Sequence, residues 1–362
     1  MSGDARERRI AAVADGLSAA HLDGLLLTGL SNIRYLTGFS GSSALLVVTP
    51  REVLLITDFR YQTQVVDEVG DIARISIEAS SLWTGLWQQL ATLSVQVLGF
   101  ETAHIQHRDF QRLVEAGARW QWRPTVDLVE TLRERKDAQE IALIAHAAEV
   151  ATRALESTLP AVRVGMSELE VAGVLEKSLR DAGSEGFPFP TIVASGPRSA
   201  LPHARSSGRV LVDGDFLLMD FGAEVAGYCS DVTRTVVMGR ASDEHRAVYD
   251  AVRVANERAA SGVRAGMSGR DADAIARHYI DRVGYGELFG HSLGHGIGLE
   301  VHEAPRLART ADGVLPVGAV VTIEPGVYRP GWGGVRIEDD VVLGPDGPQI
   351  LTNFPRELIE LG

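Results

Sequence analysis

Two aspartates in the second half of the chain have a spacing that suits metal binding. Asp220 and Asp231 lie on two apolar, strand-like runs around a short turn, a pattern that predicts a β-hairpin. A turn centred on Val225-Ala226 places the two carboxylates opposite each other, with Cβ atoms about 5 Å apart. Like charges at that separation destabilise a sheet unless something such as a divalent cation compensates them. The alternative, that one aspartate is simply a solvated strand residue, stays open for this pair alone.

Two glutamates form a second pair of the same kind. Glu324 and Glu338 flank a Pro/Gly-rich loop at 329–334, each among β-forming residues, which again predicts a hairpin with an acid on either arm. Pro325 has no N–H and therefore belongs at a sheet edge or a strand end. Burying four carboxylates without partners would cost several kcal/mol each. The four acids are therefore protonated, scattered or bound to metal.

Three histidines lie between these two segments. His291, His295 and His302 fall within twelve residues, interleaved with glycines that let the backbone approach a ligand closely. A lone histidine is most often a hydrogen-bonded packing residue, but three of them beside four acids favour metal ligands or acid–base groups. The glycines do not have the G-x-G-x-x-G spacing of a dinucleotide site.

One imidazole with four carboxylates is an oxygen-rich donor set. Such a set suits Mn²⁺, Co²⁺ or Zn²⁺ better than it suits copper or a structural zinc ion. Two divalent metal ions would balance four carboxylates, so we expect a dinuclear site with the ions about 3.5–4 Å apart. Because such a pair lowers the pKa of a bridging water, the predicted reaction class is hydrolysis.

The rest of the chain supplies the elements that must position these residues. A length of 362 residues suggests two domains, which we place at 1–130 and 131–362. In the first, short apolar runs at 25–27, 44–48, 53–57 and 95–100 predict strands and the stretch 61–69 predicts a helix, so we expect an α/β domain.

The second domain contains a weak internal repeat. Val162-Arg-Val-Gly-Met-Ser167 recurs as Val263-Arg-Ala-Gly-Met-Ser268, each copy between two helix-like segments and before a strand-rich stretch with two of the acids. The order suggests duplicated halves that each donate ligands to one site. Ser167 with Glu170 also fits a capping box that opens a helix ending near Ala182.

The composition of the chain limits the classes of partner that it can bind. The 35 Lys and Arg residues against 48 Asp and Glu residues give a net charge of −13, which argues against binding to nucleic acid or to an anionic membrane. Cys229 is the single cysteine, so no internal disulfide forms. Charged residues interrupt any signal-peptide core near the start, and no apolar run approaches 18 residues. We therefore expect a cytoplasmic protein.

Several ordered motifs resemble the pita-bread metallopeptidases that cleave Xaa-Pro bonds, namely Xaa-Pro dipeptidase (prolidase) and aminopeptidase P. The resemblance covers the whole chain. It implies an α/β creatinase-like N-terminal domain followed by an α+β pita-bread catalytic domain with duplicated halves. The motifs are Tyr35-Leu-Thr-Gly-Phe-Ser-Gly41, Thr57-Asp-Phe-Arg-Tyr61, His203-Ala-Arg-Ser, Asp220-Phe-Gly, Ser230-Asp-Val-Thr-Arg-Thr, Gly294-His-Gly-Ile-Gly-Leu-Glu-Val-His302-Glu, Thr322-Ile-Glu-Pro-Gly and Gly334-Val-Arg-Ile-Glu338-Asp-Asp.

The resemblance assigns roles to the individual residues. It implies that Asp220 chelates one metal, that Asp231 and Glu338 bridge both metals, and that His295 and Glu324 complete the other. The residues implied to bind substrate near the scissile amide or a developing oxyanion are His203, His291 and His302. Arg336 is implied to support the site from beside Glu338, so the implied catalytic group is Glu324, His203, His302 and Arg336. Arg306 matches a position that can meet the substrate carboxylate in prolidase-like relatives, and a surface-loop role is the alternative.

The expected activity is metal-dependent hydrolysis of the bond before proline in Xaa-Pro dipeptides or at the N-terminus of short Xaa-Pro peptides. The resemblance also implies a homodimer. Two alternatives remain: a pita-bread hydrolase of another bond, such as a phosphoester, and a metal-retaining binding module without peptidase activity. Preference for dipeptides or longer peptides, the residue preferred before proline and the physiological ion are not decided by any motif.

Overall fold

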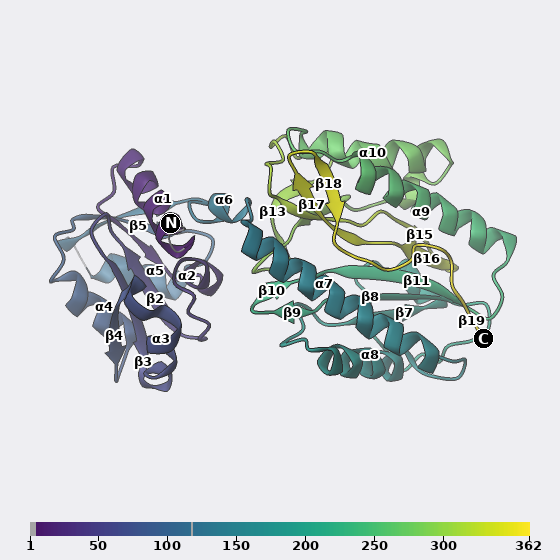
Figure 1. The fold of residues 1–362 in the computed structure, drawn as a ribbon, viewed down its shortest axis with the longest axis horizontal. Coiled ribbons are helices and arrows are strands. Elements are labelled where there is room, and N and C mark those ends of the chain that lie inside the picture. Colours follow the sequence, from purple (N-terminus) through teal and green to yellow (C-terminus); the bar gives the residue numbers. More distant parts are fainter. Residues whose placement is uncertain (1–4, 117–118) are drawn as a thin grey trace. The chain divides into compact units, whose positions relative to one another are not determined.

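The computed structural model describes residues 5–116 and 119–362, and the chain divides into two compact units, Met1–Arg133 and Glu134–Gly362 (Figure 1). Within the described ranges, no helix is both long and apolar enough to cross a lipid bilayer.

The first unit is an α/β domain built on a mixed sheet in the order β4-β3-β2-β1-β5-β6. Strand β2 runs antiparallel to β1 and β3, and the other neighbours are parallel. The expected strands and the helix are confirmed to within a few residues. The elements are β1 (Gly24–Leu27), β2 (Ala44–Val48), β3 (Val53–Asp58), β4 (Arg74–Glu78), β5 (Val97–Glu101) and β6 (Gln121–Thr125), with α1 (Ala5–Ala19), α2 (Leu30–Thr37), α3 (Gln64–Val69), α4 (Leu82–Leu90), α5 (His107–Glu115) and α6 (Glu130–Arg133).

The second unit repeats one arrangement twice, as the internal repeat predicts. Each half has two helices followed by antiparallel strands, and helices α8 and α9–α10 lie on opposite sides of the strands in Figure 1. An isolated bridge joins Ser167 to Val210 in the first half, and a second joins Ser268 to Val314 in the other. The helices are α7 (Ala138–Thr158), α8 (Glu168–Ala182), α9 (Asp243–Gly262) and α10 (Gly269–Arg282).

The strands of the second unit form two main sheets. One has the order β19-β11-β8-β7 and the other the order β13-β12-β14-β17-β18. Their bounds are β7 (Ile192–Ser195), β8 (Phe216–Phe221), β11 (Val232–Met238), β12 (Gly294–Gly296), β13 (Glu303–Leu307), β14 (Val320–Ile323), β17 (Asp339–Gly344), β18 (Gly347–Ile350) and β19 (Glu360–Leu361). Short ribbons accompany them: β9 (Glu224–Val225) with β10 (Tyr228–Cys229), and β15 (Gly326–Arg329) with β16 (Gly333–Arg336).

Each helix pair covers its own apolar core. Leu155 of α7 and Leu175 of α8 pack in one buried cluster with Val236 of β11. In the other half, Val252 of α9 and Ile280 of α10 share a cluster with residues of β14, β15, β16 and β17. The expected capping box at Ser167 and Glu170 is confirmed, because each side chain hydrogen-bonds the backbone N–H of the other. Packed helices on both sides give the strand ends a rigid support.

The first hairpin forms, but its predicted register is wrong. The turn is centred on Ala226-Gly227, both with positive φ (47° and 77°), as a two-residue primed turn requires. Asp220 therefore pairs with Thr233, and Asp231 does not lie directly opposite it. The shift amounts to two positions along one strand, so both aspartates keep the same parity and lie diagonally on one face.

The second hairpin agrees with its prediction. Strands β15 and β16 pair around the loop 330–332, and β14 pairs with β17 in the same register, so that Ile323 lies opposite Asp339. Glu324 and Glu338 occupy the break between the two ladders, one on each arm. Pro325 sits at this break, where its missing N–H costs no ladder hydrogen bond.

Candidate metal centre and active site

Five ligand-type side chains from both halves of the second unit converge on one region. Single ligand atoms of Asp231, His295 and Glu338 all lie within 4.8 Å of one another. Glu324 Oε1 is 3.5 Å from His295 Nε2, and Asp231 Oδ2 is 3.7 Å from the same nitrogen. Asp220 is close enough that its charge raises the pKa of Asp231. The residues predicted from the sequence as metal ligands are thus neighbours.

His295 presents a bare nitrogen to the acids. Its Nδ1 lies 3.0 Å from the carbonyl oxygen of Gly296, which can only accept a hydrogen bond, so the N–H is on Nδ1. Desolvation lowers the pKa of His295 to about 4, so the imidazole is neutral at neutral pH. A neutral ring with a free Nε2 is the form that binds a metal ion.

The acids are too deeply buried to be ionised together without compensation. Desolvation, followed by the charges of Glu338 and Asp220, raises the pKa of Asp231 well above its usual range. Desolvation also raises the pKa of Glu324, to about 8, and that of Glu338. Without a cation, burial therefore keeps the Glu324 carboxyl protonated at neutral pH, and it disfavours ionisation of Asp231 and Glu338.

Two buried carboxylate oxygens show where a cation fits. Among the described residues, Asp220 Oδ1 and Asp231 Oδ1 are buried and have no hydrogen-bond partner. An orphaned buried acceptor is costly, and a metal ion is a partner that removes the cost. Oxygen donors with one imidazole are the chemistry of Mn²⁺, Co²⁺ and Zn²⁺ sites. The residues present therefore fit a divalent metal.

Arg336 provides the positive charge that the protein itself supplies to the cluster. Its Nη2 donates to Asp220 Oδ2 at 2.5 Å, and its Nε donates to Thr233 Oγ1 at 3.0 Å. Thr233 Oγ1 in turn donates to Glu338 Oε2 at 2.6 Å. The guanidinium is buried, so these hydrogen bonds orient two acids from different strands against one rigid group.

His302 and His203, both predicted to bind substrate, lie near the acids and near each other. The ring of His302 lies 4.4 Å from that of His295, and desolvation lowers its pKa, with smaller lowering contributions from His203 and Arg306. Arg306 is the strand partner of His295 across β12 and β13, so the two side chains share a sheet face. His203 lies in the exposed segment between η5 (Gly196–Ala200) and β8.

His291 reaches the acids through a tyrosine. Its Nδ1 donates to the carbonyl of Ser292 at 2.8 Å, so its Nε2 accepts from Tyr328 Oη at 2.9 Å. Arg336 Nη1 donates to the same Tyr328 oxygen at 2.7 Å. Desolvation lowers the pKa of His291 to about 4, so this histidine is also neutral at neutral pH.

Three supporting residues escape the sequence analysis. Tyr328 links His291 to Arg336, Thr233 links Arg336 to Glu338, and Asp340 Oδ2 accepts from the backbone N–H of Asp231 at 3.1 Å. Strand parity is the signal that could have found Asp340, because residues two apart in a strand share a face and Asp340 follows Glu338 by two.

The chain was then compared with known proteins. The model of metallopeptidase family M24 matches residues 142–345. The chain belongs to metallopeptidase family M24. The creatinase/prolidase N-terminal domain model matches residues 9–135 of this M24 metallopeptidase. The expected fold class, a creatinase-like domain followed by a pita-bread catalytic domain, is thereby confirmed.

Individual relatives cover this M24 chain almost completely. It is 40% identical over 340 residues to the uncharacterized peptidase YqhT of Bacillus subtilis. This match covers 94% of this chain and 96% of the relative. The structure of an Xaa-Pro dipeptidase from Bacillus anthracis superposes with a TM-score of 0.95 at 42% identity, over 98% of this chain and 100% of that one. An X-Pro aminopeptidase from Thermotoga maritima gives 0.90 at 38% identity, over 98% and 99%. The M24 family is thus supported by both sequence and fold.

Proposed function

We propose that this metallopeptidase hydrolyses the peptide bond before proline, in Xaa-Pro dipeptides or at the N-terminus of short Xaa-Pro peptides. The observation that carries the proposal is the gathering of buried acids around His295 Nε2 in a chain that aligns along nearly its whole length with proteins named for Xaa-Pro cleavage. We further propose that the site takes two divalent ions. Mn²⁺, Co²⁺ and Zn²⁺ are the candidates for the physiological metal.

The proposed ligands are Asp220, Asp231, His295, Glu324 and Glu338. Asp231 and Glu338 would contact both ions, Asp220 one of them, and His295 with Glu324 the other. When bound, the ions supply Lewis-acid chemistry and lower the pKa of a water molecule toward neutrality. Two doubly charged ions also balance four carboxylates, of which Asp220 and Asp231 each have a buried oxygen without a protein donor among the described residues.

The remaining catalytic work belongs to this chain's own side chains. Glu324 is proposed to move a proton from the attacking water to the leaving nitrogen, because its carboxylate lies within the cluster, 3.5 Å from His295 Nε2. His302 and His203 are placed to hydrogen-bond the carbonyl oxygen before proline as it gains negative charge. Arg336 keeps Asp220 and, through Thr233, Glu338 in one orientation. His291, held by Tyr328, lines the same side.

Arg306 is the proposed contact for the carboxylate of a dipeptide. Its side chain is exposed, on the sheet face that carries His295, and it is near enough to His302 to influence that histidine's pKa. A guanidinium there can bind a planar carboxylate with two hydrogen bonds. A longer peptide has no carboxylate at that point, so this contact distinguishes the two substrate classes.

Cellular setting and assembly are proposed with the function. We expect the enzyme to function in the cytoplasm, because its single cysteine, Cys229, is buried and cannot form an internal disulfide. We also propose a homodimer, on the family resemblance, and light scattering of the purified protein checks it.

The test is an assay after complete chelation and return of each ion separately. Ala-Pro, Gly-Pro and Xaa-Pro-Xaa peptides are offered with Mn²⁺, Co²⁺ or Zn²⁺, and bound metal is counted by mass spectrometry. Cleavage of the bond before proline that returns only with metal supports the proposal. Activity that survives chelation, or phosphoester turnover without peptide cleavage, contradicts it, and two bound ions without any turnover indicate a binding module.

A further inference from the structure

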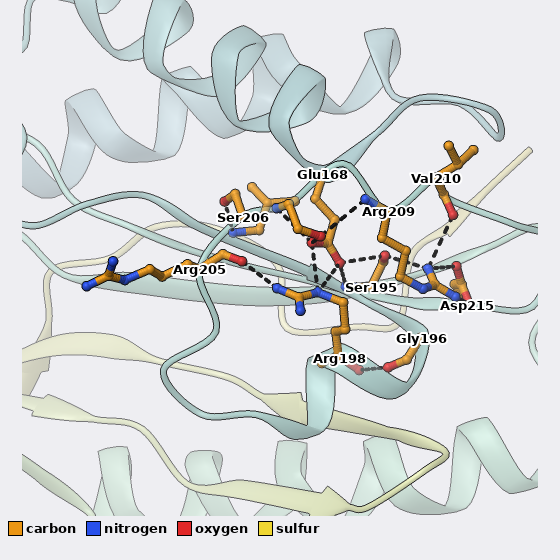
Figure 2. A network of polar contacts seen from close by, with 12 residues as sticks. Glu168, Ser195, Gly196, Arg198, Arg205, Ser206, Arg209, Val210 and Asp215 are labelled. Atoms are coloured by element: carbon orange, nitrogen blue, oxygen red, sulfur yellow. Dashed lines mark hydrogen bonds and ion pairs between the residues drawn. The ribbon is translucent and has the colours of Figure 1, made fainter.

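A buried glutamate outside the metal centre organises the segment that carries His203. Glu168 is the first residue of α8, and its side chain is inaccessible to solvent. One carboxylate oxygen accepts from the backbone N–H and Oγ of Ser195, both at 2.9 Å (Figure 2). The other accepts from the N–H and Oγ of Ser207, at 3.0 and 2.6 Å. Residues at the two ends of one loop therefore meet on a single carboxylate.

Arg198 closes the loop from inside. Its Nε donates to Glu168 Oε2 at 3.0 Å, and its Nη2 donates to the carbonyl oxygen of Arg205 at 2.5 Å. Figure 2 shows the guanidinium lying between Glu168 and that carbonyl. One side chain thus spans the segment 198–205, and His203 lies within it.

The opposite side of the segment is attached to the metal centre. Arg336, which binds Asp220, also donates from Nη1 to the carbonyl oxygen of Pro202 at 3.3 Å. The Oγ of Ser199 accepts from the backbone N–H of Gly334 at 2.8 Å. The backbone immediately before His203 is therefore held between α8 on one side and the β15–β16 ribbon on the other.

Burial makes this arrangement specific. A carboxylate taken fully out of water is costly unless every lone pair has a partner, and the partners of Glu168 come from positions 195, 198 and 207. Displacing the loop would leave the charge buried and unpaired, so the carboxylate favours a single loop conformation.

We propose that Glu168 is a positioning residue of this enzyme, which clamps the segment 195–207 so that His203 is held at the substrate. The proposal rests on the proposed function, in which His203 hydrogen-bonds the carbonyl before proline. Glu168 touches neither substrate nor metal, and its effect on the reaction passes through Arg198 and the loop.

The test compares two clamp variants with a matched control. Glu168→Gln and Arg198→Met each break the clamp, and Arg198 is partly exposed, so its replacement preserves the fold even where Glu168→Gln does not. Arg180→Met is the control, because Arg180 also lies on α8 and donates to loop carbonyls, those of Ser184 and Glu185, but has no side-chain hydrogen bond to residues 195–207 among those the structure describes. We expect kcat/KM for an Xaa-Pro dipeptide to fall about tenfold to a hundredfold in the clamp variants. The control keeps the wild-type value.

A double-mutant cycle distinguishes positioning from general support. If Glu168 acts through His203, then Arg198→Met lowers kcat/KM in the wild-type background and has no further effect when His203 is already Ala. An equal additional loss in the His203→Ala background overturns the proposal, as does an equal loss in Arg180→Met.

Hydrogen exchange gives a readout that is independent of activity. Backbone amides at 197–206 should exchange faster in Glu168→Gln and Arg198→Met than in wild type or Arg180→Met, in chelated and in metal-loaded protein alike. Unchanged exchange in both clamp variants overturns the proposal. If wild type cleaves no Xaa-Pro bond, the proposed function fails, and the exchange data still decide whether Glu168 clamps the loop.

Discussion

At the scale of single residues, the buried guanidinium of Arg336 orients the acidic side chains of the cluster. Arg336 contacts Asp220 directly and reaches Glu338 through Thr233, while its third edge binds Tyr328. A planar guanidinium offers donors in fixed directions, so each partner is aligned as well as neutralised. Two carboxylate oxygens are nevertheless left without donors, at Asp220 and Asp231. Those oxygens face the space that the proposed metals would fill.

Replacing a proposed metal ligand should abolish turnover and keep the fold. We expect Asp231→Ala or Glu324→Ala to lower kcat by at least about a thousandfold, since each removes a ligand from an assembly that acts as a unit. Activity with saturating metal, metal content and circular dichroism check this. A folded variant with near wild-type kcat would remove that residue from the assignment.

Removing the proposed carboxylate contact should separate the two substrate classes. Arg306→Ala should lower kcat/KM for an Xaa-Pro dipeptide by about 10- to 100-fold, the value of a charge-assisted hydrogen-bond pair. An Xaa-Pro-Xaa peptide amidated at its C-terminus should be cleaved at the unchanged rate, which serves as the control. Equal losses on both substrates would show that Arg306 is not a carboxylate contact.

At the scale of elements, the proposed ligands stand where strands end or ladders change partner. Glu324 and Glu338 face each other across the break between the β14–β17 and β15–β16 ladders. Asp231 lies between β10 and β11, just after the short two-stranded ribbon formed by β9 and β10. The flanking ladders orient the side chains at such breaks. In the described ladders, the residues at the break themselves have no cross-strand pairing partner. Strand ends therefore provide both rigidity and open coordination space.

The turn of the first hairpin offers a stability test that does not touch the site. Ala226 is exposed and has a φ of 47°, a region in which Asn is better tolerated than Ala. Ala226→Asn should raise the free energy of unfolding by about 0.5–1 kcal/mol with kcat/KM unchanged. Gly227→Ala, with a φ of 77° at the next position, should lower it by a similar amount. Chemical denaturation measures both, and a destabilised Ala226→Asn would contradict the turn assignment.

At the scale of the whole molecule, the second unit builds one site from two similar halves. Asp220 and Asp231 come from the half under α7 and α8, and His295, Glu324 and Glu338 come from the half under α9 and α10. Each half has its own apolar core, so the cluster of like charges lies between two independently packed supports. Packing of this kind can hold acids together against their repulsion in a way that a single hairpin cannot.

Removing metal should make stability depend on pH. Without cations, desolvation raises the pKa of Glu324 to about 8, above its usual value in the unfolded chain. The folded state then holds protons that the unfolded state has released, so the chelated protein should lose stability as pH rises from about 5 to 8. Metal-loaded protein should change far less, because its carboxylates are ionised throughout.

Thermal melts at pH 6 and pH 8, with chelator and with added metal, measure this difference. We expect the gap in Tm between loaded and chelated protein to widen at pH 8. Glu324→Gln is compared in the chelated state alone: it removes one of the titrating groups, so its Tm should fall less between pH 6 and pH 8 than that of chelated wild type. A gap that shrinks as pH rises would contradict burial of the acids in one cluster.

The sequence alone determined the chemistry of this protein and the parity of its strands. Two apolar, strand-like runs around one turn place Asp220 and Asp231 on one face in either register, and the Pro/Gly loop places Glu324 and Glu338 on paired arms. Those properties are local, because they depend on side-chain period and turn residues. The exact partner of Asp220 was mispredicted, since the choice between adjacent turn centres depends on which residues tolerate positive φ in the folded hairpin.

Only the tertiary structure decided which distant residues share a hydrogen bond. Thr233 and Glu168 gain their roles from partners far along the chain, Arg336 and Ser207, and Tyr328 gains its role by joining Arg336 to His291. Whether a carboxylate is buried and how many donors reach it depends on the packing of helices against sheets. The period of apolar residues in the sequence predicts which face of a strand or helix a residue lies on. Its burial and its hydrogen-bond partners depend on which other elements pack against that face.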